Sequence, residues 1–466
     1  MLKKYVGDKA FYKMFLVVAV PVILQNFITN LVNMIDNVMV GSLGTEEVSA
    51  VAIINQLMFV FNLAIFGAVS GAGIFTSQFF GKNDDEGIRY TIRYKAVVSL
   101  ALLVVAILAF TLGGKFLIGL YLHDGSYDCN KELAMQFASK YLRIMIVGLI
   151  PYCINQVYAS TLRETGATFV PMLAGVVAIA CNTILNFLLI FGIGIFPKLG
   201  VEGAAYATVI SRFIEAGFVF IYVRTSVKKH TYFKDSLKSL YIPLSVVKTF
   251  LKKGIPLLCN EIMWSAGMSF LTMCYSSYGL AIVAACSISS TAINLLNITF
   301  RSLGIATGII IGKDLGANEF DKAVDNVHKL NAFALFISVI IGVISFFVAD
   351  YVPYLYNVSP ESEQWAVYFV KASAVFMPFL CYENSSYFVL RAGGRIFLTS
   401  LFDGIFVLFF CGGLAFTLKS IAPVSITYVA VEATNILKAA MGFTFLKRKL
   451  WVRNLVGGSN DEQNSK

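Results

Sequence analysis

Charged residues are scarce in this sequence. They make up 14% of its 466 residues, against 58% hydrophobic residues, whereas soluble domains carry about 25% charged residues. Apolar runs of about 20 residues recur along the whole chain, and an α-helix needs this length to cross a bilayer. Segments of alternating polarity, which are typical of membrane β-strands, do not occur. The composition therefore excludes a soluble domain and predicts an all-α polytopic membrane protein.

Catalytic and cofactor motifs are also missing. The sequence contains no Walker motif, HExxH, GxSxG or CxxC, and only three histidines. ATP-driven pumping, His-based catalysis and a haem or metal cofactor are therefore not expected. All cysteines except Cys129 lie in apolar segments, so the sequence does not indicate a disulfide framework. We expect a protein that is not an enzyme and needs no cofactor.

Apolar runs separated by short polar breaks are what the sequence does contain. Twelve spans are expected at residues 14–38, 48–77, 95–113, 138–161, 168–191, 202–223, 254–277, 281–311, 331–349, 366–390, 396–417 and 422–446. Lys and Arg concentrate at both termini and in the loops that follow even-numbered spans. Because basic loops face the cytoplasm, both termini are predicted to be cytoplasmic. The net charge of +10 follows from these loops and does not indicate a nucleic-acid partner.

The two halves of the sequence repeat each other. At one constant offset, Pro21 matches Pro256 and Gly81 matches Gly316, and further along "TLRETGATF" matches "VLRAGGRIF". Each half has six spans, so the repeat is parallel, as in transporters with two pseudo-symmetric lobes. The predicted domains are an N-lobe (1–223, spans one to six), a basic cytoplasmic linker (224–253), a C-lobe (254–446, spans seven to twelve) and a cytoplasmic tail (447–466).

The first span carries many polar side chains for a membrane segment. Positions 26, 29/30, 33 and 36/37 step by three or four residues and so form one stripe on a helix. A lipid-facing carboxylate is costly, so Asp36 should face protein or a water-filled cavity. For the asparagines, interhelical hydrogen bonding and cavity lining are equally open. We place Gln25, Asn33 and Asp36 at a substrate-binding cleft.

Further polar residues lie in later spans. Glu261 follows Pro256 early in the seventh span. Desolvation lets an unpaired buried carboxylate change its protonation near neutral pH, which suits a proton- or cation-coupled step. A salt bridge to a basic residue on another helix is the alternative. Asn182 and Asn186 share one helix face and offer amide oxygens to Na⁺ or to a protonated acid. Glu383 and Asp403 are buried acids that could line the same cleft.

Several motifs spread over nearly the whole chain resemble the MATE (multidrug and toxic compound extrusion) family, in its bacterial, NorM-like branch. They are "MIDNVMVGSLG", "SQFFGKND", "LRETGAT", "NTILNFLLIFG", "LGVEGAAYATVISR", "GIPLLCNEIMWSAG" and "LRAGG". The resemblance implies twelve transmembrane helices in two six-helix lobes around a central cleft. It also implies that Asp36, Glu261 and Asn182 match family positions in the first, seventh and fifth spans.

Two positions depart from the family pattern. Asn186 stands where some members have Asp. The tenth-span acid of the NorM-like branch should align near Leu380, and Glu383 lies one turn later. The coupling ion therefore stays open between H⁺ and Na⁺, with Na⁺ expected at Asp36, Asn182 and Asn186 if it is used.

The expected function is secondary antiport in the cell membrane. Amphipathic, mostly cationic compounds would leave the cell in exchange for H⁺ or Na⁺, by alternating access between the two lobes of a monomer. Glu261, Asp36, Asn182 and Asn186 would couple ion and substrate. The alternative is a flippase of lipid-linked precursors, for which Arg301 and Lys371 would have to bind pyrophosphate.

Overall fold

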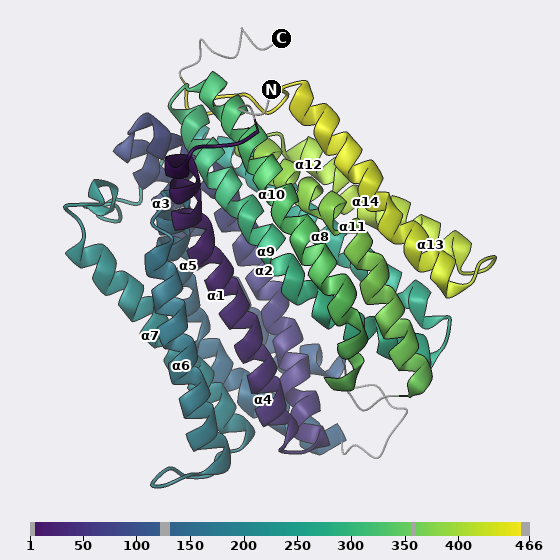
Figure 1. The fold of residues 1–466 in the computed structure, drawn as a ribbon. Helices are drawn as coiled ribbons and strands as arrows, with labels where there is room; N and C mark the ends of the chain where they lie inside the picture. Colours follow the sequence, from purple (N-terminus) through teal and green to yellow (C-terminus); the bar gives the residue numbers. More distant parts are fainter. Residues whose placement is uncertain (1–4, 122–130, 356–358, 458–466) are drawn as a thin grey trace. The chain divides into compact units, whose positions relative to one another are not determined.

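A computed structural model describes residues 5–121, 131–355 and 359–457, except for the side chains of Asn33, Met34, Asn37, Val38, Thr45, Leu280 and Leu355. Within this part of the chain all regular structure is helical (Figure 1). The α-helices are α1 Lys9–Gly41, α2 Thr45–Lys82, α3 Asp85–Gly119, α4 Lys131–Val147, α5 Leu149–Glu164, α6 Phe169–Phe191, α7 Val201–Thr225, α8 Leu244–Ser276, α9 Leu280–Gly316, α10 Phe320–Val348, α11 Pro360–Ala392, α12 Ile396–Phe402, α13 Gly412–Leu418 and α14 Val424–Lys447. Short 3₁₀ turns lie at Thr231–Phe233, Ala349–Tyr351 and Pro353–Leu355, and a π-helical turn at Phe406–Cys411.

Each of the twelve predicted spans corresponds to a helix or a broken helix. Among the described residues, ten helices are long and apolar enough to cross a membrane, and the pair α4–α5 is an eleventh candidate, bent by 42°. The bend was not expected, but Pro151 explains it, because proline cannot donate to the carbonyl of Val147 four residues earlier. The predicted seventh span is α8. It is not among these candidates, because its polar residues Asn260 and Glu261 lower its hydropathy.

The eleventh predicted span is interrupted. α12 ends at Phe402 and the π-helical turn begins at Phe406, and Asp403 between them has a non-helical backbone (φ −110°, ψ −92°). The break frees the amide of Gly404 from the helical ladder, and this amide donates to the side chain of Asn260. Sequence periodicity does not reveal such a break, because the residues on both sides remain apolar.

The chain forms two compact units. The C-terminal unit contains Met1–Ile23, Ser77–Asp84 and Ile255–Lys466, and the N-terminal unit contains Leu24–Thr76 and Asp85–Gly254. In the C-terminal unit, α11 packs against α9, α10 and α14. In the N-terminal unit, α7 packs against α4, α5 and α6. The boundaries predicted for the lobes, linker and tail stay predictions.

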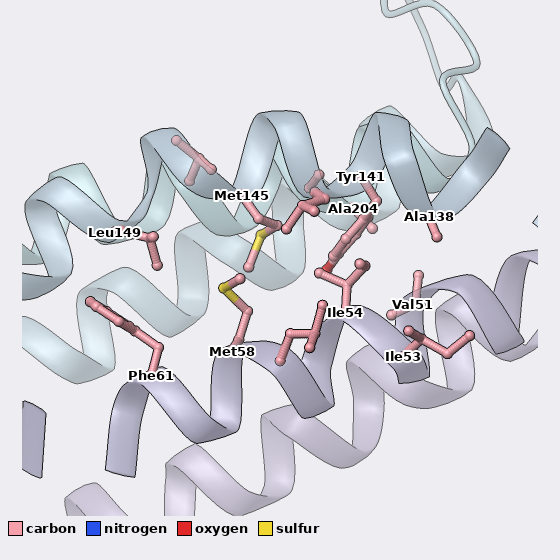
Figure 2. Packing of buried hydrophobic residues seen from close by; sticks show 14 of the residues in the cluster. Val51, Ile53, Ile54, Met58, Phe61, Ala138, Tyr141, Met145, Leu149 and Ala204 are labelled. Atoms are coloured by element: carbon pink, nitrogen blue, oxygen red, sulfur yellow. The ribbon is translucent and has the colours of Figure 1, made fainter. Parts of the chain in front are cut away.

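The core of the N-terminal unit consists of side chains from α2 packed against α4, α5 and α7. Met58 and Phe61 of α2 face Met145 and Leu149, and all four side chains are buried (Figure 2). Apolar residues fill both sides of this contact, so it keeps α2, α4 and α7 at fixed separations. α4 and α7 also contribute Tyr141 and Thr208 to the polar cluster described below.

The repeat predicted from the sequence is visible in the backbone. Asn83 and its repeat mate Asn318 both adopt a left-handed conformation, with φ values of 58° and 60°. Gly166 and its mate Gly394 do the same, with φ values of 85° and 69°. Non-glycine residues rarely adopt positive φ, so two matching asparagines indicate that the same turn follows α2 and α9.

Repeat-related glycines bring the ends of α2 and α9 together in the C-terminal unit. A Cβ atom on Gly81 would lie 1.9 Å from the carbonyl oxygen of Lys313. A Cβ atom on Gly316 would lie 1.9 Å from the carbonyl oxygen of Gln78. Because Gln78 and Lys313 are themselves repeat mates, the contact is reciprocal. It requires the absence of a side chain at both glycines.

The segment after α14 stabilises the contact between the ends of α2 and α9. Gln78 is fully buried; its amide nitrogen donates to the carbonyl of Ala392 (2.8 Å), and its amide oxygen accepts from the backbone N–H of Leu455 (2.6 Å). Trp451 is also buried, beside the backbone of Gly393. The first part of the predicted tail is thus packed against the C-terminal unit.

Part of the predicted linker is packed in a similar way, against the N-terminal unit. Tyr232 and Phe233 are buried, and the guanidinium of Arg93 on α3 donates to the carbonyl of Ser236 (2.9 Å). The ring of His230 lies between two tyrosines, with Nδ1 2.8 Å from the hydroxyl of Tyr232 and Nε2 3.3 Å from that of Tyr222.

Adding a methyl group at the glycine crossing should destabilise the protein. We expect Gly81→Ala and Gly316→Ala to lower the free energy of unfolding by about 1–3 kcal/mol, because the new Cβ overlaps backbone that cannot move independently. Thermal unfolding of the purified variants in detergent measures this. Gly217→Ala on α7 is the control, since nothing lies within 4 Å of its added Cβ, and it should be neutral or slightly stabilising. Equal effects at all three positions would contradict the close contact.

Acid should loosen the packed linker. Burial, and secondarily the charge of Lys229, lowers the pKa of His230, so the unfolded segment binds a proton more readily than the packed one. The packing is then most stable above the unfolded pKa of about 6.5 and weakens as the pH falls below it. Hydrogen exchange of residues 228–241, corrected for the pH dependence of the chemical rate, should rise several-fold between pH 7.5 and 5.5. His230→Gln should abolish this rise, and an unchanged response in the variant would disprove the role of His230.

Candidate ion and substrate sites

A polar cluster in the N-terminal unit joins three of the predicted ion-coupling residues. The amide nitrogen of Asn186 donates to a carboxylate oxygen of Asp36 at 2.7 Å. The same nitrogen lies 3.2 Å from the amide oxygen of Asn182. Asp36 comes from α1 and the two asparagines from α6, one helical turn apart on one face. The structure therefore brings together Asp36, Asn182 and Asn186, and their role in binding the coupling ion stays a prediction.

Amide groups surround the carboxylate of Asp36. The side-chain amide of Asn182 lies 2.9 and 3.1 Å from the two carboxylate oxygens, and the amide orientation that satisfies both groups lets its nitrogen donate to Asp36 while its oxygen accepts from the backbone N–H of Thr208 at 3.2 Å. The amide oxygen of Asn186 is buried and has no hydrogen-bond partner. These oxygen donors fit Na⁺ as well as a proton.

Neighbouring helices complete the cluster. α7 packs on α6 and brings the hydroxyl of Thr208 to 3.4 Å from the amide nitrogen of Asn182. Tyr141 of α4 is buried, interacts with the side chain of Thr208 and lies within electrostatic range of Asp36. Sequence reasoning missed Thr208 and Tyr141, because a single Thr or Tyr in an apolar span gives no signal of its own.

Gln25 lies apart from this cluster. Its amide nitrogen donates to the carbonyl of Pro171 near the start of α6 (3.3 Å). Along α1 it is about 16 Å from Asp36, at 1.5 Å per residue. Gln25 therefore forms a contact between α1 and α6, and its assignment to the substrate cleft stays a prediction. Asn33 belongs to the same predicted stripe, and its side chain lies outside the described residues.

Glu261 is buried on α8 in the C-terminal unit and has partners. The hydroxyl of Tyr387 donates to one carboxylate oxygen at 3.4 Å, and the guanidinium of Arg301 lies 3.9 Å from the other. The side chain of Arg301 is 54% exposed, so the ion pair is long and partly solvated. The alternative of a salt bridge to another helix is thus present in a weak form.

Glu383 forms a buried ion pair with a residue that was not predicted. Lys438 on α14 places its ammonium 3.6 Å from the carboxylate of Glu383 on α11, and both side chains are at most 7% exposed. The missed signal was Lys438 itself, because a lysine in the middle of an apolar span requires a buried partner.

Asp403 occupies the break after α12 and contacts α8. One of its carboxylate oxygens accepts from the amide nitrogen of Asn260 at 2.8 Å. The amide oxygen of Asn260 in turn accepts from the N–H of Gly404 at 3.0 Å, which fixes the orientation of the amide. The sequence predicted Asp403 as a buried acid but gave no partner. Asn260, which directly precedes Glu261, supplies it.

The two basic residues that would favour a pyrophosphate substrate both have acidic partners. Arg301 lies near Glu261, and the ammonium of Lys371 is 2.7 Å from the carboxylate of Asp350. Within the described residues, no three His, Cys, Asp or Glu side chains are grouped as a metal site.

A comparison with protein families places this geometry in context. The family model described as MatE matches residues 21–188 and 256–409, one segment in each half of the repeat. The chain belongs to the MATE family. The resemblance seen in the motifs is thereby confirmed.

Several curated relatives of this MATE chain are described as probable multidrug resistance proteins. YoeA of Bacillus subtilis (strain 168) is 28% identical over 309 residues, which cover 65% of this chain and 64% of YoeA, just under two thirds. A NorM protein of Thermotoga maritima is 23% identical over 380 residues, covering 81% of this chain and 79% of that protein.

Solved MATE structures share the fold. An outward-facing multidrug resistance MATE family transporter of the MOP superfamily aligns with a TM-score of 0.85 at 20% identity, over 96% of this chain and 97% of that one. A variant of the Vibrio cholerae MATE transporter VcmN aligns with a TM-score of 0.84 at 17% identity, over 98% and 99%. The predicted all-α polytopic membrane fold, with twelve helices from two repeated halves, is confirmed.

Proposed function

We propose that this chain is a secondary antiporter that exports amphipathic, mostly cationic compounds in exchange for H⁺ or Na⁺. The observation that carries the proposal is the cluster of Asp36, Asn182 and Asn186, in which the described partners of a carboxylate inside a membrane helix are all neutral at hydrogen-bond distance. Such a carboxylate needs a positive charge from elsewhere. A proton, Na⁺ or an organic cation each supplies one.

Competition for this charge would couple the two fluxes. When Asp36 holds a proton or Na⁺ from outside, its attraction for a bound organic cation falls, and the substrate dissociates outward. The effect is reciprocal, and a coupling free energy of about 1–3 kcal/mol is sufficient. Alternating access to the two sides of the membrane would make the exchange vectorial. In the C-terminal unit, Glu261 would be a further acid of the exchange, weakened by the nearby Arg301.

The names of the relatives support a role in drug export, and the loop charges support a cell-membrane protein with cytoplasmic termini. Relatives from Bacillus subtilis and Thermotoga maritima are described as multidrug resistance proteins. The basic residues near both termini and in the linker favour cytoplasmic termini in a multi-pass protein of the cell membrane. The proposal assigns the working unit to the monomer, with small organic cations and the lipid bilayer as partners.

Ethidium movement in proteoliposomes tests the proposal. An imposed pH gradient or an imposed Na⁺ gradient should drive transport by the wild type, and the effective gradient names the ion. Asp36→Asn should reduce gradient-driven transport by at least about tenfold, because removing a buried charge partner costs more than 1.4 kcal/mol. Glu261→Gln should weaken it less, since Arg301 already compensates Glu261.

Glu361→Gln, an exposed acid at the start of α11, is the matched control and should behave as the wild type. If Asp36→Asn retains full gradient-driven transport, the assignment of the ion site is wrong. If neither gradient moves any organic cation in a panel, the antiport proposal fails as a whole.

A second carboxylate in the cluster should favour Na⁺. Asn186→Asp would place two carboxylates within hydrogen-bond distance, and like charges this close bind a cation between them or share a proton. We expect the apparent affinity for Na⁺ in transport to rise about tenfold or more, because the added carboxylate strengthens the attraction for the bound cation. Gln364→Glu, which adds an acid at an exposed amide near the start of α11, should leave the Na⁺ dependence unchanged. An equal gain in both variants would show that the effect does not depend on this cluster.

A further inference from the structure

The C-terminal unit contains a lysine that is buried inside the membrane region. Lys438 is 5% exposed and its ammonium lies 3.6 Å from the carboxylate of Glu383, which is 4% exposed. Placing an ammonium in a membrane helix is costly even with a partner. A purely structural contact could be made from apolar residues at lower cost, so the charge itself calls for an explanation.

A second carboxylate shares this lysine. Asp403 lies within electrostatic range of Lys438 and of Glu383. Its hydrogen-bond partner is the neutral amide of Asn260, which the N–H of Gly404 holds in one orientation. The amide donates one hydrogen bond but supplies no charge. Two carboxylates therefore depend on one ammonium.

The other charged groups around this trio do not restore neutrality. Arg301 is within range of both carboxylates, but its exposed guanidinium lies beside Glu261, which needs the same positive charge. Arg391 faces Glu261 and Tyr387. Glu432 of α14 faces Lys438 and adds a further acid, although Ser373 and Asn435 donate to it. Cys411, also near Lys438, is neutral as a thiol. Of the groups named here, four acids (Glu261, Glu383, Asp403 and Glu432) face three cations (Arg301, Arg391 and Lys438), so one excess negative charge remains in the group.

We propose that Lys438 is a tethered cation that fills the cation position of the C-terminal unit, so that this unit exchanges a proton shared by Glu383 and Asp403 and does not bind Na⁺. The ammonium has the charge of Na⁺ and three donors for surrounding oxygens. A Na⁺ ion could enter this position only by displacing the ammonium, which the side chain of Lys438 holds covalently beside the carboxylate. A proton needs no such space, and it neutralises the excess charge exactly where two carboxylates compete for one ammonium.

The proposal gives the two units different ion chemistry. In the N-terminal unit the described partners of Asp36 are amides, so its cation has to come from solution. In the C-terminal unit one cation is covalently attached, and only a proton is exchanged. The consequence for transport rests on the proposed antiport function, whereas the binding of ions by the trio does not depend on it.

Thermal unfolding of the purified protein tests the exclusion of Na⁺. The background is Asp36→Asn, which removes the carboxylate of the other candidate site, and NaCl is compared with KCl at equal ionic strength and pH 8. With Lys438 present, Na⁺ should leave the Tm unchanged. With Lys438→Gln added, two carboxylates without an ammonium should bind Na⁺ and raise the Tm by about 3 °C or more at saturating Na⁺. Adding Glu383→Gln as a third change should abolish the rise.

Lys438→Arg is the matched control, because it keeps the tethered charge and should stay insensitive to Na⁺. A Na⁺-dependent rise in Tm with Lys438 intact that is lost in Glu383→Gln would overturn the proposal. A folded Lys438→Gln protein without any response to Na⁺ would overturn it as well. Transport is not measured, so these results are independent of the antiport assay.

Infrared difference spectroscopy tests the shared proton in proteins that all retain Lys438. In the Asp36→Asn background, raising the pH should remove one protonated-carboxyl band, and this band should be absent in both Glu383→Gln and Asp403→Asn. Either substitution leaves one carboxylate for one ammonium, so no proton is needed. A band that persists in both variants would show that the proton lies on another acid, and would overturn the assignment of a proton shared by Glu383 and Asp403.

Discussion

A carboxylate inside a membrane-spanning helix must have a compensating partner, and the arrangement of this protein follows from that requirement. The energy of an isolated charge in a medium of low dielectric constant is too high for a stable fold. Asp36, Glu261, Glu383 and Asp403 all face protein groups that reduce this energy. The helices that contribute those groups are held in place by the apolar contacts around them.

The two units meet this requirement with different chemistry. Around Asp36 the partners are neutral amides, which stabilise a charge by hydrogen bonding and still leave it uncompensated. Around Glu383 and Asp403 one of the partners is an ammonium. A site with neutral partners favours an exchangeable cation, whereas a site with a fixed cation favours a proton. The repeat does not impose this difference, since the mate of Asp36 is Leu271.

The two halves instead keep the same residues where the backbones of α2 and α9 are in close contact. Gly81 and Gly316 allow the ends of α2 and α9 to cross, each against the other's carbonyl group. The turns after these helices share the same left-handed asparagine. A close backbone contact tolerates no change in residue size, whereas a polar cluster can be built from many residue combinations. Such a constraint preserves the glycines in both halves while the ionisable residues diverge.

The sequence by itself determined the number of spans, the repeat and the family, because hydropathy, spacing and motifs are properties of the chain alone. It also determined which acids must be buried, and Asp36, Asn182 and Asn186 were recognised together since two share a helix face. The tertiary structure alone decided the partners. Lys438 and Glu383 lie 55 residues apart on α14 and α11, and Asn260 meets Asp403 only because α12 breaks there. Contacts between helices depend on packing across the core, and no local pattern encodes which distant residue will complete a charge.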